Sequence, residues 1–171
     1  VESITQILNA RRCSLMLLDE EKKELCIKAA KGLEEEVIAQ ARIKVGEEIG
    51  GCVAKEGVPL LVKNIEYDRS EASFPIPRRN RSSYQGRSFM SIPLRLENKL
   101  IGIINVADKN PEGQAVFNEL DLKILSALAR ESAIVIDNVR FYKQLEFFSI
   151  TDPLTGLGNY RYFIKSLDRE M

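Results

Sequence analysis

The densest group of side chains that could bind a ligand lies between Pro75 and Ser88, where the chain carries four arginines and no acidic residue. Arginine forks bind phosphate, and an aromatic face stacks on a base, so this stretch predicts a site for a small-molecule effector such as a cyclic nucleotide. A solvated loop, whose arginines meet water or nearby carboxylates, explains the same pattern. The candidate ligand-binding residues are Phe74, Arg78, Arg79, Arg81, Tyr84 and Arg87.

Three cysteines, Cys13, Cys26 and Cys52, lie inside apolar stretches without the spacing of metal ligands. We expect them to be buried, reduced core residues of a cytosolic protein. The chain has no histidine, which excludes His-ligated haem, most zinc-hydrolase sites and His-based triads. The sequence therefore predicts no catalytic residue and no metal site in this chain.

Composition narrows the class of protein. With 25 basic and 25 acidic residues the net charge is zero, which is unlike the basic footprint of a nucleic-acid binder. No apolar run is long enough to span a membrane, and no signal segment opens the chain. We therefore expect a cytoplasmic protein with no nucleic-acid partner and no membrane segment. Its 171 residues, 44% of them hydrophobic, suit one domain plus an appendage.

The apolar pattern predicts an α+β fold, with helices packed on an antiparallel sheet. Runs of strand length or alternation predict strands at 13–18, 24–31, 59–62, 87–96 and 99–107. Helical spacing predicts short helices at 1–10, 32–42 and 52–56. Pro93 cannot donate to a ladder, so we expect an edge or a bulge there. Residues 63–86 show no period and predict a long irregular connection.

A long helix is predicted from Asn118 to Phe148, because Asn118 and Asp121 can cap its start and no proline follows until Pro153. Its apolar residues form two stripes, one with coiled-coil spacing, which predicts one surface for its own domain and one for a second copy of the chain. A single wide core-facing stripe is the alternative. The predicted homodimer contacts are Leu125, Leu128, Val135, Val139 and Tyr142.

Several short sequence motifs, taken in their order along residues 1–145, resemble those of a GAF domain, a ligand-sensing module of signalling proteins. They are Gly46-Glu-Glu-Ile-Gly-Gly51, Val53 to Val62, Arg87 to Leu94, Leu100 to Val106, and Phe117 with Asp121. The resemblance implies a GAF-type antiparallel sheet, a ligand between that sheet and its covering segments, and a C-terminal signalling helix. Cyclic-nucleotide GAF domains often carry an Asn-Lys-Phe-Asp-Glu set. The corresponding residues here are Asp108, Lys109, Phe117, Asp121 and Leu122, of which the first and last depart.

Thr151 to Phe163 is similar to the opening of a GGDEF domain, the catalytic domain of diguanylate cyclases. The resemblance implies that 151–171 is the truncated start of that domain and that helix 118–148 is the linker. The GGDEF signature and the ligands of Mg²⁺ and GTP would lie beyond Met171. We therefore expect no enzyme activity and no cofactor in this fragment, whereas its parent would make cyclic di-GMP from GTP.

Two other functions remain open at this stage. A GAF domain that has lost its ligand would serve only as a dimerisation module. Free methionine sulfoxide reductases are also GAF domains and use cysteines clustered near the pocket. The three cysteines here sit on predicted strands and a helix without a sign of an activating environment.

Overall fold

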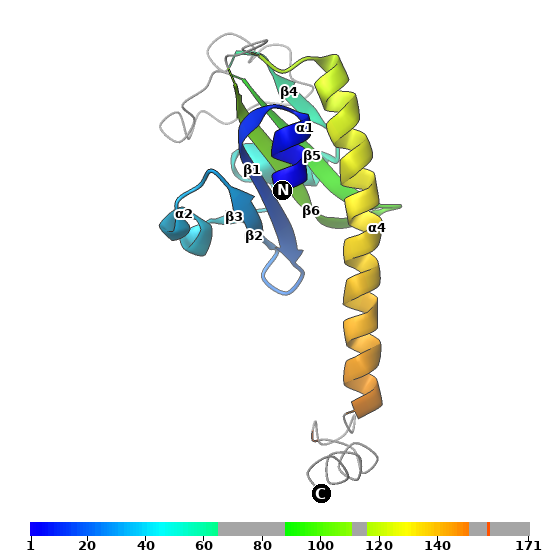
Figure 1. The fold of residues 1–171 in the computed structure, drawn as a ribbon. Coiled ribbons are helices and arrows are strands. Elements are labelled where there is room, and N and C mark those ends of the chain that lie inside the picture. The colour runs from blue at the N-terminus through cyan, green and yellow to red at the C-terminus, as the bar shows by residue number, and fades with distance from the viewer. Residues whose placement is uncertain (65–87, 111–115, 151–156, 158–171) are drawn as a thin grey trace, which may run out of the picture. The chain divides into compact units, whose positions relative to one another are not determined.

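The computed structural model describes residues 1–64, 88–110, 116–150 and 157. It divides into two compact units, Val1–Ala133 and Ile134–Met171 (Figure 1). The six residues of the predicted arginine-rich ligand site lie outside the described residues, as does most of the GGDEF-like stretch. No helix in the described ranges is long and apolar enough to cross a membrane.

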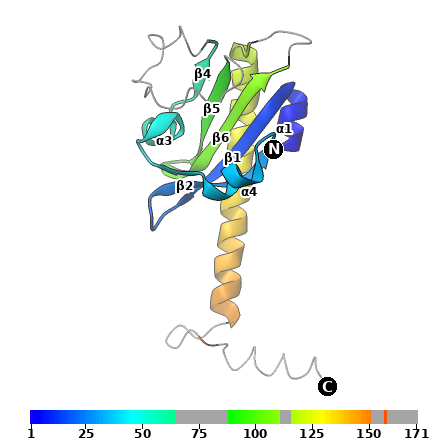
Figure 2. The ribbon, with the colours of Figure 1, turned by 90° about the vertical axis from the view of Figure 1, so that its left-hand side faces the viewer.

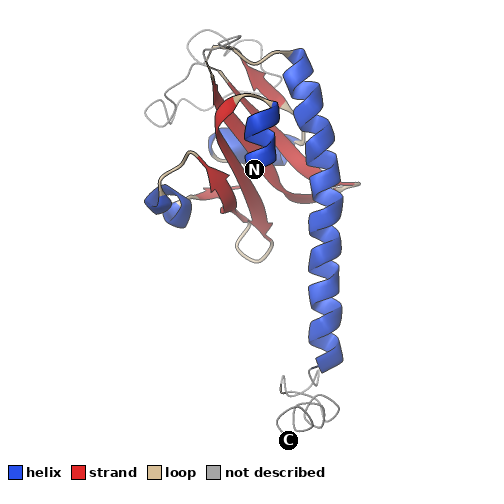
Figure 3. Cartoon of the chain, viewed as in Figure 1, coloured by secondary structure: helices blue, strands red, loops and turns tan. Residues whose placement is uncertain are grey.

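The first unit is built on one six-stranded sheet in which every neighbouring pair of strands is antiparallel (Figure 3). The strand order is β3-β2-β1-β6-β5-β4, so the two longest strands, β1 and β6, lie at the centre. This confirms the predicted α+β class and all five predicted strands; the short edge strand β3 was missed. The strands are β1 Ala10–Asp19, β2 Glu24–Lys31, β3 Arg42–Lys44, β4 Leu60–Val62, β5 Phe89–Leu96 and β6 Lys99–Lys109.

Short helices cover the sheet on both sides. They are α1 Glu2–Ile7, α2 Glu35–Gln40 and α3 Glu48–Glu56. Figure 2 shows α1 and α3 on opposite sides of the sheet. The sequence placed the start of α3 four residues too late, at Cys52, whereas the helix begins at Glu48 and includes Gly50 and Gly51. Both glycines are buried within the helix, and a Cβ on Gly51 would lie 2.2 Å from the Lys44 carbonyl oxygen. Gly57 ends α3 with a φ of 71°, as predicted.

One side of the central strands is closely packed over β5 and β6. Strand residues alternate between the two sides, so cross-strand partners form rows on one face. In the rows on this side, every residue from β5 and β6 is buried, and each is either apolar or glycine. We call this side of the sheet the filled face. Its rows are Cys13–Val106–Met90, Leu15–Ile104–Ile92 and Leu17–Gly102–Leu94.

Helix α4, Glu119–Ile150, begins with the predicted cap. The Asn118 side-chain oxygen accepts hydrogen bonds from the amides of Leu120 and Asp121 at 2.8 and 3.0 Å. Asp121 accepts in return from the Asn118 amide at 2.9 Å, which completes a reciprocal cap. The helix then buries Leu125, Ala129 and Ala133 at four-residue intervals.

The burial of Leu125 corrects one predicted dimer contact. Its side chain is 0% exposed, so it packs inside its own domain and is not accessible to a second copy. The prediction was wrong because Leu125 belongs to both patterns. Its spacing fits the coiled-coil seam, but it also lies on the stripe of α4 that faces its own domain. Near Pro93 the structure confirms the expected irregularity: β4 pairs only with Phe89 to Ser91, and the β5–β6 register shifts between Leu94 and Arg95.

Candidate ligand-binding site

A row of three polar side chains crosses the opposite side of the central strands. Ser14, Asn105 and Ser91 are cross-strand partners on β1, β6 and β5. The Ser91 hydroxyl donates to Asn105 Oδ1 at 2.7 Å, and Asn105 Nδ2 donates to the Ser14 hydroxyl at 3.3 Å. A buried polar group costs stability unless it is hydrogen-bonded, and each of these three has a partner in the row.

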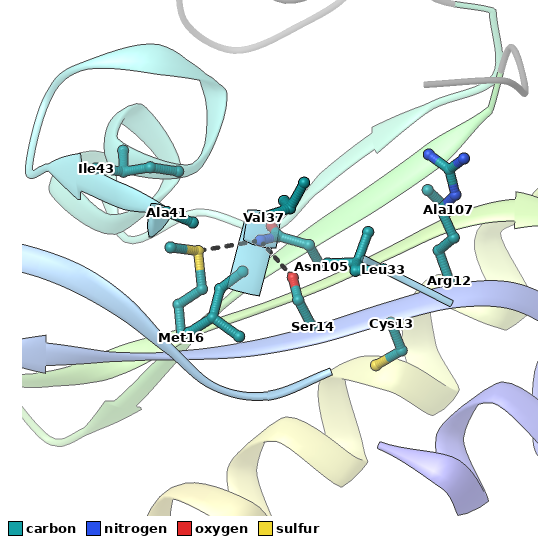
Figure 4. Close-up of a pocket in the computed structure, with 11 residues that line it drawn as sticks. Arg12, Cys13, Ser14, Met16, Leu33, Val37, Ala41, Ile43, Asn105 and Ala107 are labelled. Atoms are coloured by element: carbon teal, nitrogen blue, oxygen red, sulfur yellow. Dashed lines mark hydrogen bonds between the residues drawn. The ribbon is translucent and has the colours of Figure 1, made fainter. Parts of the chain in front are cut away.

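Two members of this polar row, Ser14 and Asn105, form the floor of a cavity of about 150 Å³ (Figure 4). Met16, Ile27 and Ile43 supply apolar walls from the strands, and Leu33, Val37 and Ala41 supply them from α2 and its flanks. Asn105 Nδ2 also approaches the Met16 sulfur at 3.7 Å. We call this side of the sheet the cavity face. It combines an apolar enclosure with a few convergent polar groups, which is the general form of a small-molecule site.

Helix α2 covers the cavity loosely. The helix has six residues, none of them buried, and no side chain caps its first turn. Val37 lines the cavity although its side chain is 47% exposed. Helix α3, in contrast, packs tightly on the neighbouring part of the same face, where Val53 is 0% and Ala54 2% exposed. The cavity therefore lies where covering segments meet the sheet incompletely.

Charged residues at the end of β6 connect the two faces of the sheet. Arg12 lines the cavity, and its Nε lies 3.0 Å from Asp108 Oδ2 in an ion pair. Asp108 has a φ of 59°, which interrupts the alternation of the strand. The next residue, Lys109, donates to Asp121 in the first turn of α4 and lies 5.4 Å from the centre of the Phe117 ring. Asp108 thus contacts Arg12 at the cavity rim, and the next residue, Lys109, contacts α4.

The three cysteines are free thiols and do not gather around the cavity. Cys13 contributes to the lining, but Figure 4 shows its sulfur directed toward α1 and α4, away from the cavity. Burial raises the pKa of the Cys13 thiol from 9.0 to about 11, and burial followed by the charge of Glu56 raises the pKa of Cys52. Raised values keep thiols protonated and unreactive.

The burial predicted for the cysteines is confirmed only for Cys13, since Cys26 and Cys52 are half-buried. Cys52 is not among the buried residues of α3, whereas the adjacent Gly51 and Val53 are buried. Its sulfur instead donates to the Gly46 carbonyl oxygen at 3.4 Å. Among the described residues, no three Cys, Asp or Glu side chains are grouped as a metal site.

Sequence reasoning missed the cavity residues. Ser14 and Asn105 interrupt the apolar runs Cys13 to Leu18 and Leu100 to Val106, and these runs were interpreted as strands buried on both faces. A single polar residue within such a run is the signal that could have identified them, because burial requires a specific hydrogen-bond partner. The partner, Ser91, lies on a third strand and could not be paired from spacing alone.

The remaining predicted dimer contacts differ in exposure. Leu128 is half-buried, whereas Val135, Val139 and Tyr142 are 60%, 48% and 71% exposed. Three further apolar side chains of the same helix segment, Ile134, Phe141 and Leu145, are also exposed. Exposed apolar side chains in such density are characteristic of surfaces that bind another protein.

Known structures share this architecture. A GAF domain from a Coxiella burnetii phosphoenolpyruvate-protein phosphotransferase is 22% identical with a TM-score of 0.68, covering 84% of this chain and 82% of that one. A GAF domain/HD domain protein from Geobacter sulfurreducens is 12% identical with a TM-score of 0.65, covering 82% and 88%. A free methionine-R-sulfoxide reductase from Neisseria meningitidis is 20% identical with a TM-score of 0.59, covering 75% and 68%.

These likenesses show the fold, and no curated protein matches the chain. The family is shown by a sequence model, that of the GAF domain, which matches residues 1–137. The match includes the whole sheet, the cavity and the first turns of α4. This chain therefore belongs to the GAF domain family.

Proposed function

We propose that this chain is the sensory part of a signalling protein, in which a ligand in the cavity regulates a diguanylate cyclase domain. The observation that carries the proposal is the continuity of α4 from Glu119 to Ile150. This one helix begins beside the end of β6, whose Asn105 and Ala107 line the cavity, and ends at the GGDEF-like stretch that starts at Thr151. A continuous helix joined to both ends is suited to transmit a change of state.

The end of β6 offers a route from the cavity to the helix. A ligand that displaces Arg12 acts on Asp108, and Asp108 is covalently joined to Lys109, which holds Asp121. Such a ligand regulates only by binding one arrangement of these residues more tightly than the other. A difference of about 1.4 kcal/mol corresponds to a tenfold shift in the population of the two arrangements.

Dimerisation is the second part of the proposal. Condensing two GTP molecules into cyclic di-GMP requires two GGDEF domains facing each other, with bound Mg²⁺, in the cytoplasm where GTP is present. Val135, Val139 and Tyr142 follow one another at steps of four and three residues, which is the spacing of a two-helix seam. We propose that these side chains pair with those of a second copy and set the orientation of the two output domains.

The function can be tested by changing the rotation of the end of α4 about the helix axis. Residues 1–163 are fused to a complete GGDEF domain, with the junction inside the GGDEF-like stretch. Extra helical residues are then inserted between Lys143 and Gln144. Seven inserted residues restore the helix phase to within about 20°, whereas two rotate it by about 200°. We expect the seven-residue insertion to retain cyclic di-GMP synthesis and the two-residue insertion to reduce it at least tenfold. Equal activity in both fusions would contradict a role for α4 as the regulatory linker.

The two alternative functions make different predictions. A reductase requires reactive thiols, so thiol titration of the folded chain would have to label at least two of the three cysteines rapidly. Two observations oppose a reductase. The Cys13 sulfur is directed away from the cavity, and the pKa values of Cys13 and Cys52 are raised, which keeps both thiols protonated. A ligand-free dimerisation module would keep the phase dependence of the fusions and show no stabilisation by any small molecule in thermal melts.

A further inference from the structure

The size of the cavity limits its ligand. Its volume is about 150 Å³, and engineered cavities of about this size bind a single benzene ring. Pockets for drug-sized molecules are about 300–1,000 Å³. The cavity enclosed by the described residues therefore has room for a ligand of about six to eight non-hydrogen atoms. This volume favours a ligand smaller than a cyclic nucleotide.

The lining determines the chemistry of that ligand. Five of the wall residues are aliphatic or thioether side chains from Met16 and from positions 27, 33, 37 and 43. At the floor, one Asn105 N–H is directed at the Met16 sulfur, which is a weak acceptor, at 3.7 Å. The Ser14 hydroxyl hydrogen is a second donor at the same place. An acceptor oxygen on the ligand would replace the sulfur as the partner of Asn105.

The charges at the rim disfavour an ionised ligand. Among the described residues that line the cavity, only Arg12 is charged, and its Nε lies 3.0 Å from the buried carboxylate of Asp108 in an ion pair. Arg12 contacts Asp108 through Nε, so an anion at the rim would share the guanidinium with the buried carboxylate and lie close to its negative charge. An uncharged ligand avoids this repulsion and can still move the two ion-paired side chains by contact.

We propose that the cavity binds a compact, uncharged, largely aliphatic compound carrying one acceptor oxygen, a carbonyl or hydroxyl, that hydrogen-bonds Asn105 and Ser14. Leu33 and the exposed Val37 on α2 close over its apolar body. The proposal rests on the proposed sensory function and assigns the ligand class of that site. It predicts selectivity by size, charge and a single oxygen.

The test uses the 171-residue chain with its methionine methyl groups labelled with carbon-13. Met16 lines the cavity, whereas Met90 is 0% exposed in a row of the filled face and serves as an internal control. The probe is cyclohexanone. Its matched analogues are methylcyclohexane, which has the same shape without the oxygen, and cyclohexanecarboxylate, which is charged. Cyclic AMP and cyclic GMP are tested in parallel, and a Met16→Leu variant assigns the signal.

We expect cyclohexanone to shift the Met16 signal saturably and to leave Met90 unchanged. Methylcyclohexane should bind about two- to tenfold more weakly, which is the value of one hydrogen bond. Cyclohexanecarboxylate should cause no shift. Val37→Trp fills the mouth of the cavity and should abolish the response, whereas Val58→Trp, at a position 41% exposed and outside the lining, should retain it.

Two results would overturn the proposal. A Met16 shift caused by the carboxylate or a cyclic nucleotide, with affinity equal to or above that of cyclohexanone, would assign the site to anions and leave the sensory function standing. No Met16 shift with any probe, in a chain whose Met90 signal reports a folded core, would refute the ligand class. The sensory function itself is tested separately, by comparing cyclic di-GMP synthesis between the fusions with two and seven inserted residues.

Discussion

The two faces of the central strands differ although the same strands build both. On the filled face, the rows from β1, β6 and β5 contain only apolar side chains and Gly102, and those on β5 and β6 are fully buried. On the cavity face, the central row is the polar set Ser14, Asn105 and Ser91, and about 150 Å³ is left open above it. Alternation lets one strand place a stabilising residue and a binding residue next to each other.

The difference shows where stability and binding are concentrated. Close packing on the filled face contributes to stability through apolar burial and dispersion. A cavity and a buried polar row contribute less, since a void loses contacts and hydrogen bonds are nearly balanced by those made with water in the unfolded chain. Substitutions on the two faces should therefore have different costs, and these differences can be measured.

The largest effect is expected for Leu125→Ala, which removes a side chain that is 0% exposed on the inward stripe of α4. Truncating a buried leucine leaves a cavity and lowers the free energy of unfolding by about 2–5 kcal/mol. Leu120→Ala is the matched control in the same helix, because Leu120 is 64% exposed and should change stability by less than about 0.5 kcal/mol. Denaturant unfolding of both variants gives the comparison. Equal costs would show that Leu125 is not packed in the core of its domain.

The second prediction concerns pH and the filled face. Burial raises the pKa of Cys13 to about 11, so the folded state keeps the proton that the unfolded thiol releases near pH 9. Above pH 9 the unfolded state binds fewer protons, and the contribution of Cys13 to stability falls by about 2–3 kcal/mol up to pH 11. Below pH 9 the contribution is constant.

Comparison with Cys13→Ala isolates this effect from the titration of lysines and tyrosines. The stability difference between the native chain and Cys13→Ala should be constant from pH 7 to 9. It should then change by about 2–3 kcal/mol in favour of the variant up to pH 11. A difference that stays constant to pH 11 would mean that the thiol reaches water, which contradicts a tightly packed filled face.

The third prediction addresses the polar row. Asn105→Leu leaves the buried hydroxyls of Ser14 and Ser91 without their amide partner, which should cost about 1–3 kcal/mol. Replacing the whole row, with Ser14→Ala and Ser91→Ala added, removes those unsatisfied groups and should recover most of that loss. The triple variant should lose the preference for cyclohexanone over methylcyclohexane, and Asn105→Leu, which keeps the Ser14 hydroxyl, should weaken it. If the triple variant is less stable than Asn105→Leu, the row is structural and the contrast between the faces is weaker than proposed.

Sequence alone predicted the features that depend on local pattern. The five strands, the cap formed by Asn118 and Asp121, and the irregularity near Pro93 follow from periodicity and from the hydrogen bonds that one residue can make, and all are confirmed. The polar row and the cavity depend on which strands become neighbours. Ser14 and Asn105 are separated by 91 positions, and no local pattern specifies that they pair.

Two errors have the same origin. Gly50 and Gly51 lie inside α3 although glycine is a poor helix former, and both are buried there: the Ile103 side chain leaves no room for a Cβ at Gly50, and the Lys44 carbonyl leaves none at Gly51. Leu125 fits a coiled-coil seam by spacing but is buried in its own domain. In both cases tertiary packing overrode what the local sequence pattern predicts.

The smallest effect is expected for Val37→Ala, on the loosely packed α2. Val37 is 47% exposed and α2 has no buried residue, so the substitution should change the free energy of unfolding by less than about 0.5 kcal/mol. With cyclohexanone bound, the two lost carbons are part of the closed wall, and at about 0.8 kcal/mol for each buried carbon the probe should bind up to about fifteenfold more weakly. Chemical denaturation and titration of the Met16 signal measure the two quantities on the same samples. A large loss of stability without probe would show that α2 is already part of the packed core. An unchanged affinity would show that α2 does not close over the ligand, and the cavity face would then be an open surface in both states.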